Sequence, residues 1–193
     1  MATMILEGVV TTRNPDGTTN VAPMGPLTDE SVSFLTFRPW QSSQTCQNLG
    51  THPEGVFHVV DDVYLIAQGA VGVWTEPVET MPSERVAGAV IRSACRWYEF
   101  RVTEFDRASE RTTVQTEIVH VGRGRDYFGL NRAKHAVLEA AILATRLHLI
   151  DAAEIDREWE RLRIPVEKTA GERERAAFAL LTEYVADWRS QGR

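Results

Sequence analysis

The hydrophobic pattern changes near residue 129, and this change constrains the fold more than any other feature of the chain. Before it, short runs rich in β-branched and aromatic residues are broken by Gly, Pro, Asn and Asp. After it, apolar residues recur at helical spacing. Short strands between turn residues favour an antiparallel barrel or sandwich, and amphipathic spacing favours helices. We therefore expect a β-rich α+β chain in two parts, residues 1–128 and 129–193.

The first part contains six runs with the character of strands. Residues 5–12 and 18–24 flank Asn14-Pro15-Asp16-Gly17, a strong turn signal because Pro presets φ and Gly accepts a positive φ. A Ser cap at residue 42 or 43 begins a short helix that Gly50 ends, and Asp61-Asp62 begins a helix over 64–71. The segment 75–83 holds two prolines and is expected to be a loop. Further strands are expected at 31–37, 55–60, 97–105 and 112–121.

The second part is expected to consist of three helices. Apolar residues at helical spacing cover residues 131–149 and 171–189. Between these helices, Asp151 and Glu154 resemble a capping box, and Pro165 is expected to end the middle helix near Arg163.

Composition narrows the class of protein. The 193 residues include 21 Lys and Arg and 27 Asp and Glu, which gives a net charge of −6 and argues against a general nucleic-acid binder. No apolar run approaches the roughly 20 residues of a membrane span, and residues 1–8 do not resemble a signal peptide. Cys46 and Cys95 are expected to be reduced. These features predict a cytoplasmic protein whose partners are neither nucleic acid nor membrane.

Several common motifs are missing from the sequence. There is no Walker A sequence, no G-x-G-x-x-G after a strand and no G-x-S-x-G elbow. The five histidines have no metal-ligand spacing, so no metal site is predicted. Asp61-Asp62 is interpreted as a helix start rather than a catalytic pair. His58 is interpreted as a core residue, with a role beside a cofactor as the alternative.

The segment 38–49 contains the most informative polar cluster. A predicted strand ends at Arg38, and a short polar helix begins at Ser42 or Ser43. Free backbone N–H groups at a helix start favour an anion. The hydroxyl groups of Ser43 and Thr45 and the Arg38 guanidinium can add donors. This combination suits a phosphate monoester, although a capped surface helix would have a similar sequence.

A second cluster, Asn20-Val21-Ala22-Pro23-Met24-Gly25-Pro26, lies where a strand meets two prolines. Proline is excluded from central strand positions, so this strand ends here or lies at a sheet edge. Small residues and Pro at such a place let a flat ring approach the main chain. The alternative is a simple transition from strand to loop.

Together, residues 11–25 and Arg38…Ser43-x-Thr45-x-x-Asn48-Leu49 resemble the FMN-binding split-barrel superfamily. More closely, the chain resembles a flavin-reductase-like branch with a C-terminal helical extension, whose signatures are similar to residues 128–136 and 167–171. The resemblance implies an antiparallel split barrel over 1–128, with a three-helix extension over 129–193 packed on it.

The resemblance also implies a site. The FMN phosphate would be held by Ser43 and Thr45, with Arg38 and Asn48 nearby, and the isoalloxazine would lie along Asn20, Ala22, Pro23 and Met24. Flavin reductases often carry Lys or Arg in the phosphate segment, whereas this chain has Gln41, Gln44 and Gln47 there. Arg38 would then neutralise the phosphate. Weaker candidates for contact with FMN are Trp97, Asn131, Arg132 and Lys134.

The function implied is hydride transfer from NAD(P)H through FMN to an acceptor, in a homodimer with FMN near the two-fold interface. No catalytic acid or base is assigned, because the hydride step itself requires none. Two alternatives stay open. One is a non-enzymatic FMN carrier or sensor, and the other is an accessory protein of a one-carbon or pterin pathway.

Overall fold

The computed structural model describes residues 3–191, which form two compact units. The first contains the residues up to Val60 together with Val78–Tyr127, and the second contains Asp61–Pro77 together with the residues from Phe128 onward. The chain therefore leaves the first unit after Val60, returns at Val78 and leaves it again after Tyr127. The linear division into domains 1–128 and 129–193 stays a prediction.

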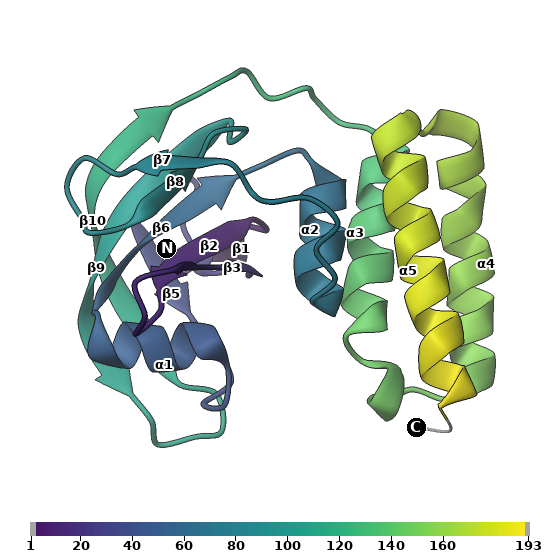
Figure 1. Cartoon of the computed structure of the whole chain (residues 1–193), viewed down its shortest axis with the longest axis horizontal. Coiled ribbons are helices and arrows are strands. Elements are labelled where there is room, and N and C mark those ends of the chain that lie inside the picture. Colours follow the sequence, from purple (N-terminus) through teal and green to yellow (C-terminus); the bar gives the residue numbers. More distant parts are fainter. Residues whose placement is uncertain (1–2, 192–193) are drawn as a thin grey trace. The chain divides into compact units, whose positions relative to one another are not determined.

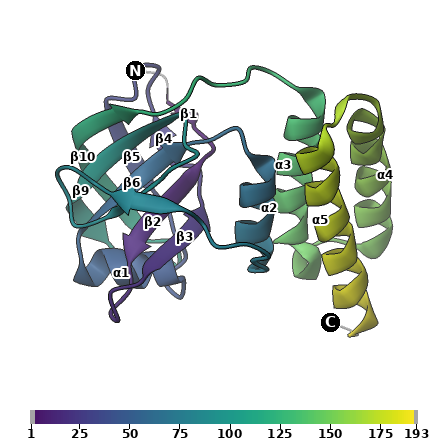
Figure 2. The ribbon, with the colours of Figure 1, turned by 45° about the horizontal axis from the view of Figure 1, so that its top comes forward.

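The first unit is built on an eight-stranded antiparallel sheet in the order β1-β4-β5-β10-β9-β6-β2-β3. Figures 1 and 2 show that this sheet is strongly curled. Its strands are β1 (Met4–Ile5), β2 (Val9–Arg13), β3 (Thr19–Pro23), β4 (Leu27–Thr28), β5 (Phe34–Phe37), β6 (Glu54–Val59), β9 (Arg96–Asp106) and β10 (Thr113–Arg123). A separate hairpin pairs β7 (Thr80–Pro82) with β8 (Ala89–Ile91). The α+β, split-barrel prediction is confirmed.

Aromatic residues from β5, β6 and β9 fill the inside of the curled sheet. The Phe37 ring lies 4.9 Å from that of Phe100 and 6.1 Å from that of Phe57, measured between centroids, and all three side chains are fully buried. Leu49, from helix α1 (Gln44–Thr51), packs into the same cluster. Burial of this apolar surface holds α1 against the sheet.

The predicted strand over 5–12 is two strands, β1 and β2, separated by residues 6–8, the last of which is Gly8. A Cβ atom at Gly8 would lie 2.3 Å from the carbonyl oxygen of His58, so the chain there passes too close to β6 for any side chain. The predicted turn at 14–17 is confirmed. Gly17 has a φ of 86°, and its N–H donates to the Asn14 carbonyl oxygen at 2.9 Å.

The prediction of a loop over 75–83 is wrong at its end, where β7 forms. Thr80 pairs with Ile91 and Met81 with Val90, and Pro82 occupies the last position of the strand. Proline is tolerated at the margin of a two-stranded ribbon because one side of each strand has no neighbour. The prediction failed because it took both prolines of the segment as strand breakers, wherever they lay.

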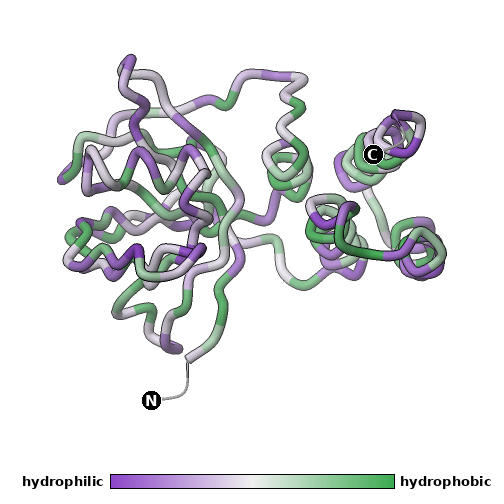
Figure 3. Tube along the Cα trace, turned by 90° about the horizontal axis from the view of Figure 1, so that it is seen from below, coloured by the Kyte–Doolittle hydropathy of each residue, from purple (hydrophilic) through white to green (hydrophobic). Residues whose placement is uncertain are grey.

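The second unit consists of helices α2 (Val63–Val71), α3 (Arg132–Ala144), α4 (Ala152–Thr169) and α5 (Glu172–Ser190), with a 3-10 turn, η1 (Leu147–Leu149). Helix α2 packs on α3 and α5, and α3 packs on α4. Five alanines line the buried side of α3: Ala133, Ala136, Ala140, Ala141 and Ala144. Seen near end-on in Figure 3, the helices carry both hydrophobic and hydrophilic residues around their circumference.

Two predictions about the helices are wrong. The middle helix does not end near Arg163: α4 includes Pro165 and continues to Thr169. The Thr169 hydroxyl donates to the Pro165 carbonyl oxygen at 2.8 Å, which adds a side-chain bond within the last turn. Proline removes one N–H from the helix, and neighbouring contacts can outweigh that loss. The first helix ends earlier than predicted, at Ala144, and η1 follows it.

Candidate functional site

Six polar side chains from the β2–β3 hairpin and α1 form one hydrogen-bonded group, called here the hairpin cluster: Thr12, Asn14, Asn20, Gln44, Thr45 and Asn48. The Asn20 amide donates to the hydroxyls of Thr12 and Thr45, each at 3.1 Å. The Asn48 amide donates to the Thr12 hydroxyl at 3.0 Å and to Asn14 Oδ1 at 2.8 Å. Gln44 Nε2 donates to Asn48 Oδ1 at 2.8 Å. This network ties the hairpin to α1.

The members of the cluster differ in exposure. Asn48 is 1% exposed and Thr45 is 2% exposed, and both Asn48 amide hydrogens are in use. Asn20 is half-buried and bridges from Thr45 toward the surface. A ligand at the surface would therefore contact Asn20 before the buried Thr45 and Asn48. These two residues hold the cluster together from the protein interior.

The start of α1 provides backbone donors. Ser43 is the N-cap: its hydroxyl accepts from the Cys46 N–H at 3.2 Å and donates to the Trp40 carbonyl oxygen at 2.8 Å. The N–H groups of Gln44 and Thr45 lie in the first turn, where a helix offers them no internal partner. No acidic residue occupies this turn. The helix dipole and these groups favour an anion here.

Arg38 is the nearest cation in the sequence to this helix start. Its side chain is exposed, and no described residue forms an ion pair with it. It follows β5 directly, so the strand brings it to the loop that leads into α1. An unpaired guanidinium can approach a phosphate without first breaking a salt bridge.

The other predicted residues lie on the edge strand. Among residues 3–191, β3 is the last strand of the sheet and pairs only with β2, so no described strand lies on its outer side. Ala22, Pro23 and Met24 are half-buried there, and Ala22 and Met24 pack against the aromatic core. The prediction that the two prolines mark a strand end at an edge is confirmed.

Of the eight predicted site residues, the structure joins Asn20, Thr45 and Asn48 through hydrogen bonds and places Ser43 directly beside Thr45. Arg38 makes no described hydrogen bond to this group. Sequence reasoning missed Thr12, Asn14 and Gln44. The hairpin register pairs Thr12 with Asn20, and strand alternation would have placed their side chains on one face.

His58 is a core residue, as preferred from the sequence. It is fully buried on β6; its Nδ1 lies 3.0 Å from the Val9 carbonyl oxygen, and its Nε2 accepts from the Ile91 N–H at 3.1 Å. Burial lowers the pKa of His58 to about 4, against a smaller opposing effect of the bond to Val9. Neutral His58 therefore donates through Nδ1 and has no free nitrogen for a ligand.

The four weaker candidates have other roles or no described contact. Trp97 is buried, and its ring lies against Gly122, where a Cβ would be 2.0 Å from it. Asn131 caps α3 by accepting from the Ala133 N–H at 2.8 Å. Lys134 pairs with Glu174 at 2.8 Å and donates to the Asp61 carbonyl oxygen at 2.6 Å. Arg132 is exposed.

Asp61 and Asp62 both act at a helix or segment terminus. Asp62 is the N-cap of α2 and accepts from the Tyr64 N–H at 3.1 Å, which confirms the predicted helix start. Asp61 accepts from the Phe128 N–H at 2.7 Å.

Within residues 3–191, no three His, Cys, Asp or Glu side chains converge as metal ligands. No helix over the same residues is both long and apolar enough to cross a membrane.

Comparison with solved structures defines the fold class of this chain. The FMN-bound protein MM1853 from Methanosarcina mazei has 20% identity and a TM-score of 0.79 over 93% of this chain and 94% of that one. The 2-nitrobenzoate 2-nitroreductase NbaA from Pseudomonas fluorescens has 18% identity and a TM-score of 0.52 over 61% and 64%. The flavin reductase PheA2 has 15% identity and a TM-score of 0.53 over 65% and 82%. The chain has the flavin-reductase-like split-barrel fold.

Two family models match this chain and identify its family. The N-terminal domain model of DUF447, described as a protein of unknown function, matches residues 6–125, and the DUF447 C-terminal model matches residues 131–183. The chain belongs to the DUF447 family. No curated protein matches it.

Proposed function

We propose that this protein binds FMN, with the phosphate at the start of α1 and the isoalloxazine along the outer edge of β3. The hairpin cluster is the observation that carries the proposal, because it fixes α1 and β3 relative to each other. The FMN-bound DUF447 relative, which matches over 94% of its length, supports the choice of ligand.

The residues present fit such a ligand. The phosphate would meet the Gln44 and Thr45 N–H groups, with Arg38 supplying the positive charge that the three glutamines of the segment lack. Ser43 would hold the helix start in place through its cap. Thr45 would hold Asn20 directly, and Asn48 would do so through the Thr12 hydroxyl. Ala22, Pro23 and Met24 would offer a low, largely apolar surface for the ring.

We further propose an oxidoreductase of the flavin-reductase type. FMN supplies the redox chemistry when bound, accepting a hydride from NAD(P)H and passing two electrons to an acceptor. The chain would bind and orient the cofactor, and His58 would stay outside the proton chemistry because both its nitrogens are engaged. We also propose a homodimer, with the partner subunit completing the site, and a cytoplasmic location.

Titration with FMN tests the central proposal. The visible spectrum of FMN should shift on binding, and FMN should raise the melting temperature of the protein. Arg38→Gln should weaken FMN binding about tenfold or more, since a hydrogen bond to a charged group contributes roughly 1.5–3 kcal/mol. Arg92→Gln is the matched control, because Arg92 is an exposed arginine of the same unit and no described residue forms an ion pair with it. Absence of FMN binding to the wild-type protein would overturn the proposal.

Turnover separates an enzyme from a carrier or sensor. An assay with NADH or NADPH and excess FMN should show steady oxidation of the nicotinamide if the protein is a reductase. Retention of FMN without turnover under either nicotinamide would identify a binding module. Sedimentation at micromolar protein concentration tests the dimer, and a monomeric mass would remove the interfacial site.

A further inference from the structure

The two faces of the β2–β3 hairpin have different environments. Successive side chains of a strand point to opposite faces, so Thr11 and Arg13 lie opposite Thr12. The Thr12 hydroxyl meets Asn48 of α1, whereas the Thr11 hydroxyl donates to the Ala89 carbonyl oxygen at 2.6 Å. The register pairs Arg13 with Thr19, which places both on the Thr11 face. The hairpin therefore lies between the hairpin cluster and a second site, and Thr12 of β2 borders both.

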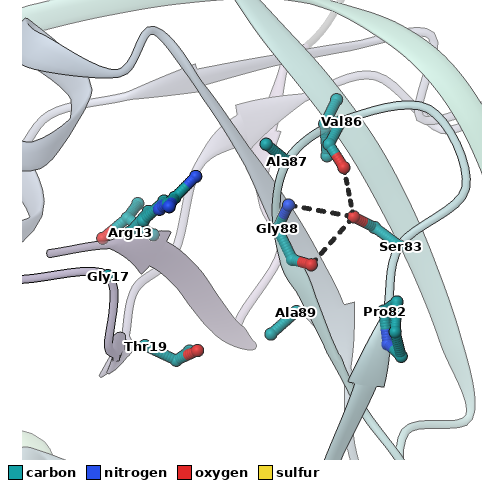
Figure 4. A pocket seen from close by; sticks show the side chains of 10 residues that line it. Arg13, Gly17, Thr19, Pro82, Ser83, Val86, Ala87, Gly88 and Ala89 are labelled. Atoms are coloured by element: carbon teal, nitrogen blue, oxygen red, sulfur yellow. Dashed lines mark hydrogen bonds between the residues drawn. The ribbon is translucent and has the colours of Figure 1, made fainter.

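A pocket of about 310 Å³ lies on this second face. One side is the hairpin, with Arg13, Gly17 and Thr19, and the other is the segment from Pro82 to Ala89, as Figure 4 shows. Thr12 also lines it. The pocket is wide enough for a small organic molecule, and its glycine and alanine residues let a ligand approach the backbone closely.

Internal hydrogen bonds fix the wall formed by residues 82–89. The Ser83 hydroxyl lies between the Gly88 N–H, at 3.0 Å, and the carbonyl oxygens of Val86 and Gly88 (Figure 4). The Glu99 carboxylate, fully buried on β9, accepts from the N–H groups of Glu84 and Arg85 at 2.8 and 2.6 Å. A wall held in this way needs little reordering when a ligand binds.

The charges around the pocket favour an anion. Arg13 is its only charged lining residue, and no described residue forms an ion pair with it. The neighbouring acids have other partners: Glu99 accepts from the loop backbone, Glu54 accepts from the Ala87 N–H at 2.7 Å, and Asp16 accepts from the Thr18 hydroxyl at 2.6 Å. In a chain with a net charge of −6, this concave surface has a cation and no acid.

We propose that this pocket binds a small organic anion at a site separate from the proposed FMN site. A carboxylate or phosphate group on the ligand pairs with the Arg13 guanidinium and accepts from the Thr19 hydroxyl. The apolar body of the ligand lies against Pro82, Val86 and Ala87. The Arg13 fork suits the two oxygens of either group.

Titration of the full chain without FMN, followed by NMR at the amides of Gly17, Ala87 and Gly88, tests this site. The probes are phenyl phosphate and benzoate, with benzyl alcohol as the uncharged match and inorganic phosphate as the bare anion. Phenyl phosphate or benzoate should shift these amides saturably. Benzyl alcohol should not, and inorganic phosphate should bind more weakly than phenyl phosphate because it has no apolar body.

Arg13→Gln should weaken binding of the organic anion about tenfold or more, and Arg13→Lys should recover part of the loss. Ala87→Phe should block the pocket with the cation still present. FMN binding should be unchanged in Arg13→Gln and weakened in Arg38→Gln, so the two sites fail independently. The proposal is overturned if neither organic anion shifts these amides, if Arg13→Gln leaves their affinity unchanged, or if FMN displaces the probe from the pocket.

Discussion

The two units of this protein each contain a polar group that the sequence marks as noteworthy, and the two groups are built differently. The hairpin cluster consists of neutral amides and hydroxyls at a helix start. The exposed Arg38 precedes that helix in the sequence, and no described residue forms an ion pair with it. In the helical unit, Lys134 pairs with Glu174 and binds the Asp61 carbonyl oxygen. Glu174 also accepts from the Gly171 N–H at 2.9 Å.

The two groups differ in whether their charged side chains already have an ion-pair partner within the described residues. Burial raises the pKa of Glu174, but the hydrogen bonds from Lys134 and Gly171 outweigh it, and the net pKa is lowered. The ion pair in the helical unit therefore holds the segments starting at Asp61, α3 and α5 together. In the barrel unit, no described residue forms an ion pair with Arg38, and the first turn of α1 contains no acidic residue. The polar group of the helical unit is a packing contact, whereas that of the barrel unit is the one proposed to meet a ligand.

Loss of the Lys134 ammonium should give the largest effect. Lys134→Met removes the cation that pairs with Glu174 and donates to the Asp61 carbonyl oxygen, and the Lys134 and Glu174 side chains are only 15% and 10% exposed. The free energy of unfolding should fall by about 3–4 kcal/mol in urea denaturation. Lys168→Met is the control, because Lys168 is exposed on α4. Equal stability of the two variants would mean that the pair has no structural role.

Acid should weaken the barrel unit through His58. Its pKa is 6.5 in the unfolded chain and about 4 in the folded one, so only the unfolded state binds a proton between these values. Stability from this group is complete above pH 6.5 and falls as the pH drops toward 4, by about 3 kcal/mol in all. Urea denaturation across this range measures the slope.

His58→Gln does not titrate, and its stability should depend less on pH in that range than the stability of the wild type. His135→Gln is the matched control for the same substitution at an exposed position, on α3. A wild-type slope in His58→Gln would show that other groups cause the acid sensitivity.

Asn20→Ala tests whether the hairpin cluster serves a ligand. Asn20 is half-buried and makes two neutral hydrogen bonds, so its loss should lower stability by about 1 kcal/mol. FMN affinity, measured by fluorescence titration, should fall by about tenfold because β3 and α1 lose their link. A stability loss as large as that of Lys134→Met, with unchanged FMN affinity, would make the two polar groups equivalent and break the comparison.

Arg132→Ala should have the smallest effect. Arg132 is exposed at the start of α3 and makes no described ion pair. Both the free energy of unfolding and FMN affinity should change by less than about 0.5 kcal/mol. A clear loss of FMN affinity would instead return Arg132 to the list of FMN contacts, through a subunit interface.

Local signals in the sequence predicted much of the fold. The turn at 14–17 and the cap at Asp62 depend on residues close together in the chain, so they could be recognised. The break at Gly8 depends on the approach of β6, and the continuation of α4 through Pro165 depends on contacts around it, which no local pattern contains.

The site was predicted in outline for the same reason. Ser43 and Thr45 belong to a local helix start, but Thr12 and Asn14 join the cluster only because the hairpin register brings them to Asn20 and Asn48. The structural role of Lys134 was missed because its partners, Asp61 and Glu174, are distant in the sequence.

The second unit consists of two separate stretches of the chain, so its helices are synthesised at different times. Helix α2 leaves the ribosome before β9 and β10 complete the barrel sheet, and long before α3 and α5 exist to cover it. Its apolar residues, among them Val63, Leu65 and Ile66, are therefore exposed on the nascent chain until the C-terminal segment is made. A chain cut after residue 128 would keep this helix without its packing partners and should bind chaperones more than the full-length protein.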